Sequence, residues 1–155
     1  MKNFQRNLST GEVEVQDSTI YHKTEYRERR NHYAIYSVNT KIDGFDTSRD
    51  AFLGAYRGAD SPEAVENGKC TNSMASGWSP IASHQINVDL AAGETKTFIF
   101  VLGYIENPED EKWESYGVIN KTRAKEMLAK YQTDAQVEEA FAALQAYWKQ
   151  LLARY

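Results

Sequence analysis

The stretch HQINVDLAAGETKTFIFVLGY, residues 84–104, decides the fold class. One face of its first arm carries His84, Ile86, Val88 and Leu90. Polar residues alternate with these four, which is the period-two pattern of a half-buried strand. Residues 91–94 (AAGE) indicate a turn, and residues 96–104 (KTFIFVLGY) follow as a strand that is apolar on both faces. Because such a strand is expected between two layers, the two arms predict a hairpin of a β-sandwich.

The rest of the first two-thirds of the chain has similar patterns. Residues 12–15 (EVEV) alternate acidic and apolar side chains, and residues 33–38 (YAIYSV) indicate a second, more aromatic strand. Residues 43–50 (DGFDTSRD) are turn-forming, and residues 61–76 are polar and indicate a long loop. We therefore expect residues 1–105 to form a β-sandwich portion.

Residues 106–155 indicate an acidic connector followed by a helical linker of two amphipathic helices. Asn120 can cap the first helix, and Thr133, three residues before Gln136, has capping-box spacing for the second. The second helix carries an apolar stripe in steps of three and four, made of Val137, Phe141, Leu144, Trp148, Leu151 and Tyr155. The stripe indicates either core or a helix docked on another surface. The predicted fold class is mainly β with C-terminal helices.

Composition and charge narrow the possible functions. The 155 residues, 41% hydrophobic and 26% charged, suit one soluble globular domain or a domain with an appendage. A net charge of −4 argues against a general nucleic-acid binder, which usually has a basic surplus. No apolar run is long enough to span a membrane, and the first residues lack the hydrophobic core of a signal peptide. With Cys70 as the single cysteine, these features predict a cytoplasmic protein without disulfides.

The strongest candidate for a site is the stretch YHKTEYRERRNHYAIYSV, residues 21–38. It places three arginines beside several tyrosines. A guanidinium group binds carboxylate, phosphate or sugar hydroxyls, and an aromatic ring offers a face to a sugar. The alternative is a solvated edge strand in which the three arginines pair with Glu25 and Glu28.

Other chemical motifs are weaker. The glycines form no phosphate-binding loop, and no nucleophile elbow is present. The three histidines His22, His32 and His84 are too scattered to indicate a metal site. Two groups of acids, Asp43, Asp46 and Asp50 and those of residues 109–114, lie in polar segments where water would keep their pKa values ordinary. Trp78 and Trp113 can either stack on a sugar or plug the end of the sandwich.

Five strings of the sequence, taken together, closely resemble the cellobiose phosphorylases, which are inverting glycoside phosphorylases. They are NFQRNLSTGEVEV (residues 3–15), YHKTEYRERRNHYAIYSVN (21–39), GFDTSRDAFLGAYRG (44–58), SGWSPIASH (76–84) and FVLGYIENPEDEKWE (100–114). The strings are long and idiosyncratic, and they extend over essentially the whole chain.

The resemblance implies an enzyme that cleaves a β-linked disaccharide with inorganic phosphate, giving α-glucose 1-phosphate and glucose. It implies no metal and no organic cofactor, a homodimer, and a polypeptide much longer than 155 residues. In this family a β-sandwich and linker helices precede an (α/α)₆ barrel that holds the catalytic aspartate. That barrel is absent here and no catalytic residue is carried over, so we expect the chain alone to be inactive.

The resemblance also implies a place for the arginine segment, because the sandwich of one subunit lies over the barrel entrance of its partner. The substrate-binding residues expected at this edge are Tyr26, Arg27, Arg29, Arg30 and Asn31. In a strand, Arg27 and Arg29 point to one side while Glu28 and Arg30 point to the other, so we expect one set to reach the sugar or phosphate. We favour Arg29 and Arg30 over Arg27.

Two other functions fit the sequence. The chain could be a stand-alone carbohydrate-binding sandwich that uses Trp78 and the arginine segment, or a purely structural assembly domain. If opening strands of the sandwich lie outside this chain, its sheets have unpaired edges. We then expect the isolated chain to self-associate.

Overall fold

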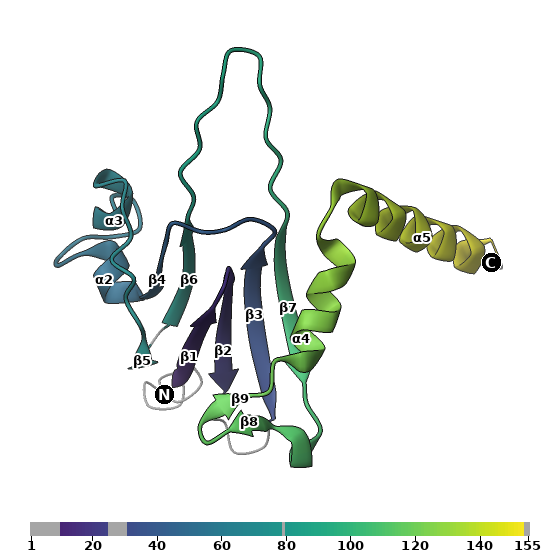
Figure 1. The fold of residues 1–155 in the computed structure, drawn as a ribbon, viewed down its shortest axis with the longest axis horizontal. Helices are drawn as coiled ribbons and strands as arrows, with labels where there is room; N and C mark the ends of the chain where they lie inside the picture. The colour runs from purple at the N-terminus through teal and green to yellow at the C-terminus, as the bar shows by residue number, and fades with distance from the viewer. Residues whose placement is uncertain (1–9, 25–30, 79, 154–155) are drawn as a thin grey trace.

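A computed structural model describes residues 10–24, 31–78 and 80–153 of the chain (Figure 1). Within these residues the centre of the fold is a five-stranded antiparallel sheet in the order β5-β1-β2-β3-β7. Its strands are β1 (Thr10–Gln16), β2 (Thr19–Thr24), β3 (His32–Val38), β5 (Ser76–Trp78) and β7 (Phe100–Glu106). The predicted strands at residues 12–15 and 33–38 are thereby confirmed.

The strand register divides this sheet into two faces. Tyr21 lies opposite Ile35, and Ile35 lies opposite Gly103, so these residues share one face, which we call the linker face. The buried cluster on the linker face contains Tyr21, Tyr33, Ile35, Ile105, Ile119, Ala124 and Leu128. The last three belong to the segment after the sheet, which therefore covers this face.

The opposite face, which we call the inner face, packs against a second sheet. Within the described residues that sheet has two antiparallel strands, β4 (Gly44–Ser48) and β6 (Pro80–Gln85). Val13 and Ile20 of the inner face pack with Phe45 of β4, and the ring of Tyr36 stacks on His84 of β6 with centroids 4.8 Å apart. The predicted β-sandwich fold is confirmed. The segment expected as a turn, residues 43–50, instead contains β4, because Phe45 packs on the inner face of the five-stranded sheet and Thr47 accepts a hydrogen bond from the Ala75 N–H.

Two short helices follow β4 and form a lobe at one side of the second sheet (Figure 1). These are α2 (Arg49–Leu53) and α3 (Glu63–Glu66). Ser48 caps α2 by accepting a hydrogen bond from the Ala51 N–H. An ion pair between Arg57 and Glu66 closes the lobe.

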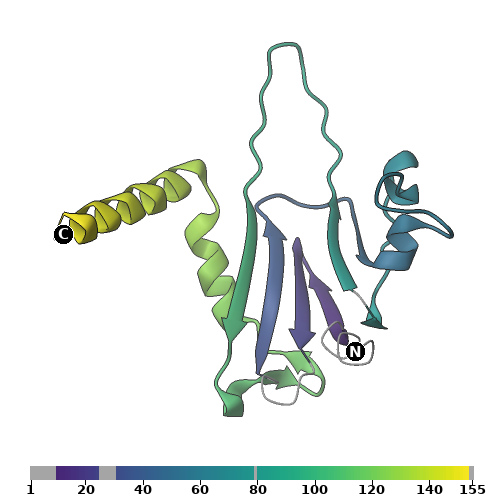
Figure 2. The same cartoon turned by 180° about the vertical axis from the view of Figure 1, so that it is seen from behind.

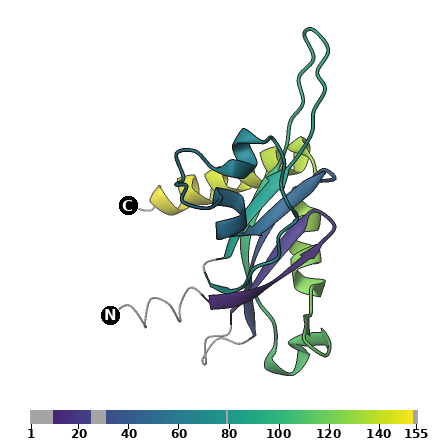
Figure 3. The same ribbon diagram turned by 90° about the vertical axis from the view of Figure 1, so that its left-hand side faces the viewer.

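The predicted hairpin of residues 84–104 is wrong in its pairing. β6 pairs with β4 and β7 pairs with β3, so the connection crosses from one sheet to the other. Residues 86–99 project beyond both sheets as a long arm, which Figures 1 and 2 show at the top. Figure 3 shows the same arm from the side, in line with the sheets. The alternating pattern of its residues is that of a strand, but the described chain supplies no neighbouring strand.

β7 is an edge strand of the five-stranded sheet. On its linker face Ile105 is buried and Gly103 allows close approach, since a Cβ there would collide with Met127. On its inner face Phe100, Leu102 and Tyr104 are 48%, 81% and 53% exposed. β7 was expected between two layers. The described residues cover it on the linker face and leave its inner face exposed.

The segment after β7 builds a hairpin and two longer helices. Its elements are the 3-10 helix η1 (Glu109–Glu111), strands β8 (Trp113–Ser115) and β9 (Val118–Ile119), helix α4 (Thr122–Leu128), the 3-10 helix η2 (Ala129–Tyr131) and helix α5 (Asp134–Leu152). The predicted capping box of Thr133 and Gln136 is present at the start of α5. None of the helices in the described ranges is long and apolar enough to cross a membrane.

The apolar stripe of α5 is exposed rather than core. Phe141, Leu144 and Trp148 are 65%, 52% and 49% exposed, and no described residue of α5 is buried. Between α5 and β7 lies an apolar groove of about 700 Å³, lined in part by Phe100, Leu102 and Phe141. Of the two sequence interpretations, a helix that docks on another surface therefore fits the structure.

Replacing Ile35 with alanine tests the placement of the core. Ile35 is 1% exposed on the linker face, so Ile35→Ala should lower the free energy of unfolding by about 2 to 5 kcal/mol. Leu102→Ala, at the neighbouring edge strand, is the control and should cost less than about 1 kcal/mol in this chain. Urea denaturation measures both, and equal losses would contradict the assignment of the two faces.

Candidate functional site

Most of the predicted sugar-facing residues lie outside the described residues. These are Tyr26, Arg27, Arg29 and Arg30. The structure does describe the end of β2, at Lys23 and Thr24, and the start of β3, at Asn31 and His32. These residues are the two flanks of the arginine segment.

The returning flank is fixed by Asn31, the one predicted site residue that the structure describes. Its side-chain Nδ2 donates a hydrogen bond of 2.6 Å to the Asn107 carbonyl oxygen. In return the Asn107 N–H donates to the Asn31 carbonyl oxygen at 3.0 Å. Asn107 is fully buried and also donates to the Asn120 carbonyl oxygen at 2.9 Å. Asn31 is thus tied to the connector, and its described contacts are those of a structural residue.

The same flank has an aromatic and ionic contact at His32. Its ring lies 5.3 Å from that of Tyr104, and its Nε2 is 3.6 Å from a carboxylate oxygen of Glu106. Both partners belong to β7, which pairs with β3 throughout its length. The start of β3 is therefore held from its edge as well as from the connector.

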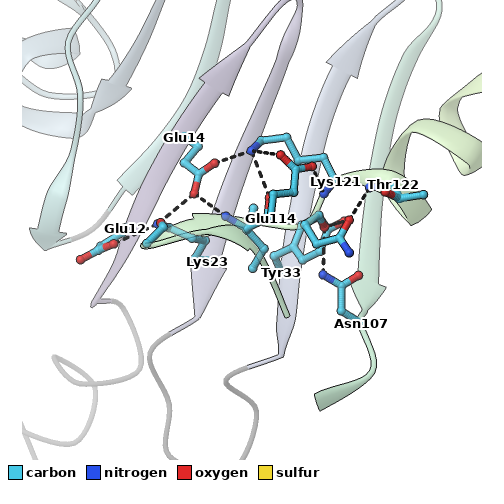
Figure 4. A network of polar contacts seen from close by, with 11 residues as sticks. Glu12, Glu14, Lys23, Tyr33, Asn107, Glu114, Lys121 and Thr122 are labelled. Atoms are coloured by element: carbon cyan, nitrogen blue, oxygen red, sulfur yellow. Dashed lines mark hydrogen bonds and ion pairs between the residues drawn. The ribbon is translucent and has the colours of Figure 1, made fainter. Parts of the chain in front are cut away.

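The departing flank is fixed by Lys23, whose side chain is 5% exposed (Figure 4). Its Nζ lies 3.0 Å from a carboxylate oxygen of Glu12 and 3.0 Å from one of Glu14. It also donates to the Gly117 carbonyl oxygen in the β8–β9 turn at 2.9 Å. A single ammonium group therefore joins the end of β2, strand β1 and the hairpin.

Glu14 connects Lys23 to a second buried lysine, Lys121, which immediately precedes α4 (Figure 4). Nζ of Lys121 is 2.6 Å from the other carboxylate oxygen of Glu14 and donates to the Ile119 carbonyl oxygen at 3.1 Å. The Ile119 N–H donates to Glu14 at 3.0 Å. We call Lys23, Glu14 and Lys121 the buried ion triad.

The pKa values follow from this geometry. Burial alone would raise the pKa of Glu14, but the hydrogen bonds from Lys121, the Ile119 N–H and Lys23 outweigh burial and lower it. Burial alone would lower the pKa of Lys23, but Glu14 and Glu12 outweigh burial and raise it. Glu14 and Lys23 are consequently charged at neutral pH, which preserves their mutual attraction.

The uncharged hydroxyl of Tyr33 makes a further hydrogen bond beside the triad. Its hydroxyl donates to the Asn120 carbonyl oxygen at 3.0 Å, just before α4 begins. Burial, more than any other cause, raises the pKa of Tyr33 to about 12. The phenol therefore stays protonated and keeps its hydrogen bond at physiological pH.

The two best-buried carboxyl groups of the described residues, Glu14 and Asp46, are unsuited to act as general acids. Asp46 accepts hydrogen bonds from the backbone N–H and hydroxyl groups of Thr71 and Ser73, the two hydroxyl bonds measuring 2.7 and 2.6 Å. Burial would raise the pKa of Asp46, but these bonds outweigh it and lower the pKa. Protonating a glycosidic oxygen needs a raised carboxyl pKa. Both groups therefore fix segments of the chain and hold their charge. The expectation that water surrounds Asp46 is wrong, because Asp46 is fully buried.

The structure also bears on the two tryptophans that could stack on a sugar and on a possible metal site. Lys112 Nζ lies 4.0 Å above the ring of Trp113, and Lys23 Nζ lies 5.5 Å from the same ring. The side chain of Trp78 lies outside the described residues. Among described residues no group of three or more His, Cys, Asp or Glu side chains is placed to hold a metal ion.

Sequence reasoning missed the buried ion triad. The alternation in residues 12–15 indicated a half-buried strand with Glu12 and Glu14 in water. Instead the connector covers this face, and Glu14 is 19% exposed at its side chain. The signal that could have found the triad is the cross-strand pairing of Glu12 with Lys23, but it required the register of β1 and β2.

These features define a β-sandwich domain whose connector and helix α4 are held on one sheet face by buried ions. The two best-buried carboxylates of the described residues position other segments. The chain belongs to the glycosyl hydrolase 94 family: the family model described as "Glycosyl hydrolase 94, supersandwich domain" matches residues 1–134.

Two enzymes with different substrate names are among the similar proteins. The chain is 32% identical over 113 residues to N,N'-diacetylchitobiose phosphorylase of Vibrio furnissii, covering 73% of this chain and 12% of that protein. It is 28% identical over 110 residues to solabiose phosphorylase of Paenibacillus borealis, covering 71% of this chain and 13% of that protein. The chain thus spans a small part of the length of the curated relatives that it matches.

The comparisons confirm the predicted phosphorylase family but not the member. They support a supersandwich domain of the family's disaccharide phosphorylases, whereas the restriction to cellobiose is not shown. The division at residues 105 and 106 stays a prediction.

Removing the charge of Glu14 should be far more costly than removing that of Glu12. Both lie on the same face of β1, but Glu12 is 61% exposed and Glu14 separates two buried lysines. Glu14→Gln should lower the free energy of unfolding by about 3 kcal/mol, because two buried ammonium groups then keep only the more exposed Glu12 and Glu114 as carboxylate partners. Glu12→Gln is the isosteric control and should cost less than about 1 kcal/mol. Similar losses in urea denaturation would show that the triad does not hold the connector.

Acidification should weaken the sandwich through its buried histidines. Burial lowers the pKa of His84 and of His22 below 6.5 in the folded chain. The unfolded chain therefore takes up protons first as the pH falls below about 6.5, and stability is lost from that point downward. His84→Phe keeps the stack on Tyr36 and should flatten the decline between pH 7 and pH 5. Parallel stability curves for the two proteins, measured by thermal unfolding, would contradict this cause.

Proposed function

We propose that this chain is the sandwich-and-linker portion of a longer disaccharide phosphorylase. That enzyme would cleave a β-linked disaccharide with inorganic phosphate, with inversion, to α-glucose 1-phosphate and glucose. The chain would contribute no catalytic acid and would serve dimer assembly and the edge of the partner's active site. The enzyme would need no metal or organic cofactor, would act in the cytoplasm, and would bind neither nucleic acid nor membrane.

The observation that carries this proposal is the way in which both flanks of the arginine segment are anchored. Lys23 is held by the buried ion triad, and Asn31 is held by Asn107 of the connector. The segment between them contains Arg27, Arg29 and Arg30. A cationic segment on a rigid base can orient sugar hydroxyls, phosphate or a partner's carboxylates with little loss of conformational entropy. The matched family and the phosphorylase names of the relatives also support a role in a disaccharide phosphorylase.

The exposed faces support the proposal that further domains belong to the protein. The stripe of α5 and its groove against β7 leave Phe141, Leu144 and Trp148 in solvent. Such an apolar patch usually marks a surface that another unit covers. In the proposed enzyme that unit is the barrel domain of the same polypeptide, to which α5 leads.

We propose cellobiose as the first substrate to test, because the five sequence strings resemble cellobiose phosphorylases. N,N'-diacetylchitobiose and solabiose are the rival substrates, since the relatives carry those names. Formation of the corresponding sugar 1-phosphate from each disaccharide and inorganic phosphate ranks the three. The alternative is a stand-alone carbohydrate-binding sandwich that uses Trp78 and the arginine segment. Saturable quenching of tryptophan fluorescence by cellobiose in this chain alone would favour that alternative.

Arg29→Ala in the longer polypeptide tests the role of the arginine segment. Losing one charged hydrogen-bond donor should lower kcat/KM for phosphorolysis by at least about tenfold, while the melting temperature changes by less than about 2 °C. Arg29→Lys keeps the charge without the planar fork and should give an intermediate value. Arg57→Ala, in the lobe of α2 and α3, is the control and should leave kcat/KM unchanged. Wild-type kinetics in Arg29→Ala would contradict the proposed role of Arg29 in substrate binding.

A further inference from the structure

The direction of helix α5 is not set by close packing against the sheet. No described residue of α5 is buried, and an apolar groove of about 700 Å³ lies between its first half and β7. Figures 1 and 2 show α4 running beside β7 and α5 turning away from it. The contacts that remain to orient α5 are the hydrogen bonds at the bend between the two helices.

Two glutamine side chains bridge this bend. Gln132 donates from Nε2 to the carbonyl oxygen of Leu128, the last residue of α4, at 2.7 Å. Gln136, in the first turn of α5, donates from Nε2 to the Ala129 carbonyl oxygen at 3.1 Å. Its Oε1 accepts a hydrogen bond from the Gln132 N–H at 2.9 Å. The end of α4 is therefore joined to the start of α5 by side chains as well as by the main chain.

Asn39 joins the same bend to the sandwich. It follows β3 directly, and its Nδ2 donates to the Gln132 carbonyl oxygen at 3.1 Å. Its Oδ1 accepts from the Ile99 N–H at 2.9 Å, and its own N–H donates to the Ile99 carbonyl oxygen at 3.1 Å. Within the described ranges, the bond to Gln132 is the one hydrogen bond between the sandwich and residues 129–153. We call Asn39, Gln132 and Gln136 the junction network.

Hydrogen bonds suit the task of orienting an exposed helix. They weaken steeply when donor and acceptor leave their preferred line, whereas apolar contact has no preferred direction. The two bonds with Ile99 hold Asn39 at the base of the arm, so its Nδ2 is aimed at the bend before α5 begins. One asparagine thus links the end of β3, the returning half of the arm and the start of α5.

We propose that the junction network, with Asn39 as its positioning residue, fixes the direction in which α5 leaves the sandwich and ties that direction to the base of the arm. The inference goes beyond the proposed function, because it concerns the orientation of α5 in the 155-residue chain and does not require the longer polypeptide. In the proposed enzyme, the same network would set the angle at which the sandwich meets the domain beyond α5.

A distance distribution between two spin labels tests the inference. Gln16→Cys at the end of β1 and Lys149→Cys near the end of α5 place the labels at exposed positions. Cys70→Ser removes the single native cysteine. Double electron–electron resonance on the labelled chain, diluted with unlabelled chain, should give one narrow distribution. A broad distribution in this parent protein would overturn the inference.

Asn39→Asp separates the two roles of Asn39. The aspartate keeps an oxygen for the Ile99 N–H but loses the donor to Gln132, so the distribution should widen at least about twofold as α5 becomes free to swing. Asn67→Asp makes the same change at an exposed residue of the lobe of α2 and α3, and should leave the width unchanged. A lower melting temperature with an unchanged, narrow distribution would make Asn39 a stabilising residue only and overturn the inference.

Gln136→Glu tests the network from the helix side. It keeps the acceptor oxygen of the capping box and loses the donor to Ala129, and a negative charge in the first turn favours the helix. Circular dichroism should therefore show an intact helix while the distance distribution widens. Gln145→Glu, at an exposed position in the middle of α5, is the control. Equal, narrow distributions in the two variants would overturn the inference, and this pair leaves the sandwich untouched if Asn39 variants lower its stability.

Hydrogen exchange tests the link to the arm without labels. The Ile99 amide should exchange at least about tenfold faster in Asn39→Ala than in the wild-type chain, because its acceptor is lost. In Asn39→Asp the acceptor remains, and the Ile99 amide should keep its wild-type rate. Equal Ile99 rates in Asn39→Ala and the wild-type chain would overturn the proposed link between the arm and α5.

Discussion

The carboxylate of Glu14, held between two buried ammonium groups, is the interaction on which the arrangement of this domain depends. It joins the β1–β2 hairpin to the residue before α4, which lies more than one hundred residues further along the chain. Removing three charges from water is costly, and the cost is offset only when each charge keeps its partners and hydrogen bonds. The triad therefore specifies one arrangement of the connector on the sheet more than it adds stability. The surrounding apolar cluster of Tyr21, Tyr33 and Ile119 supplies the burial that makes those partners necessary.

This arrangement has a direct consequence for the arginine segment. The same end of the sheet carries the triad, the Asn31–Asn107 pair and the hydrogen bond from Tyr33 to Asn120. Each contact links a sheet strand to the connector, so the segment between Lys23 and Asn31 starts and ends on fixed positions. The opposite, inner face is built differently, with a partial second layer and an exposed edge strand. One face of the sheet is thus closed by this chain, and the other is covered only in part by the described residues.

The sequence predicted the local elements better than their partners. The alternation in β1 and β3 and the capping box at Thr133 depend on neighbouring residues, and all were found where expected. The hairpin of residues 84–104 was wrong because its two arms have strand patterns but pair with strands in different sheets. The triad was missed for a similar reason, since Lys121 and Glu14 are more than one hundred residues apart. Of the predicted site residues only Asn31 is described, and its described partner, Asn107, could not be inferred from local pattern.

The most direct test of this account is a double-mutant cycle between Glu14 and Lys121, using Glu14→Gln, Lys121→Met and the double variant. Unfolding by urea gives the coupling energy of the pair. The account predicts a coupling of at least about 1.5 kcal/mol, because each single variant leaves a buried charge that the double variant removes. Additive losses, with a coupling near zero, would contradict the claim that this ion pair locks the connector to the sheet.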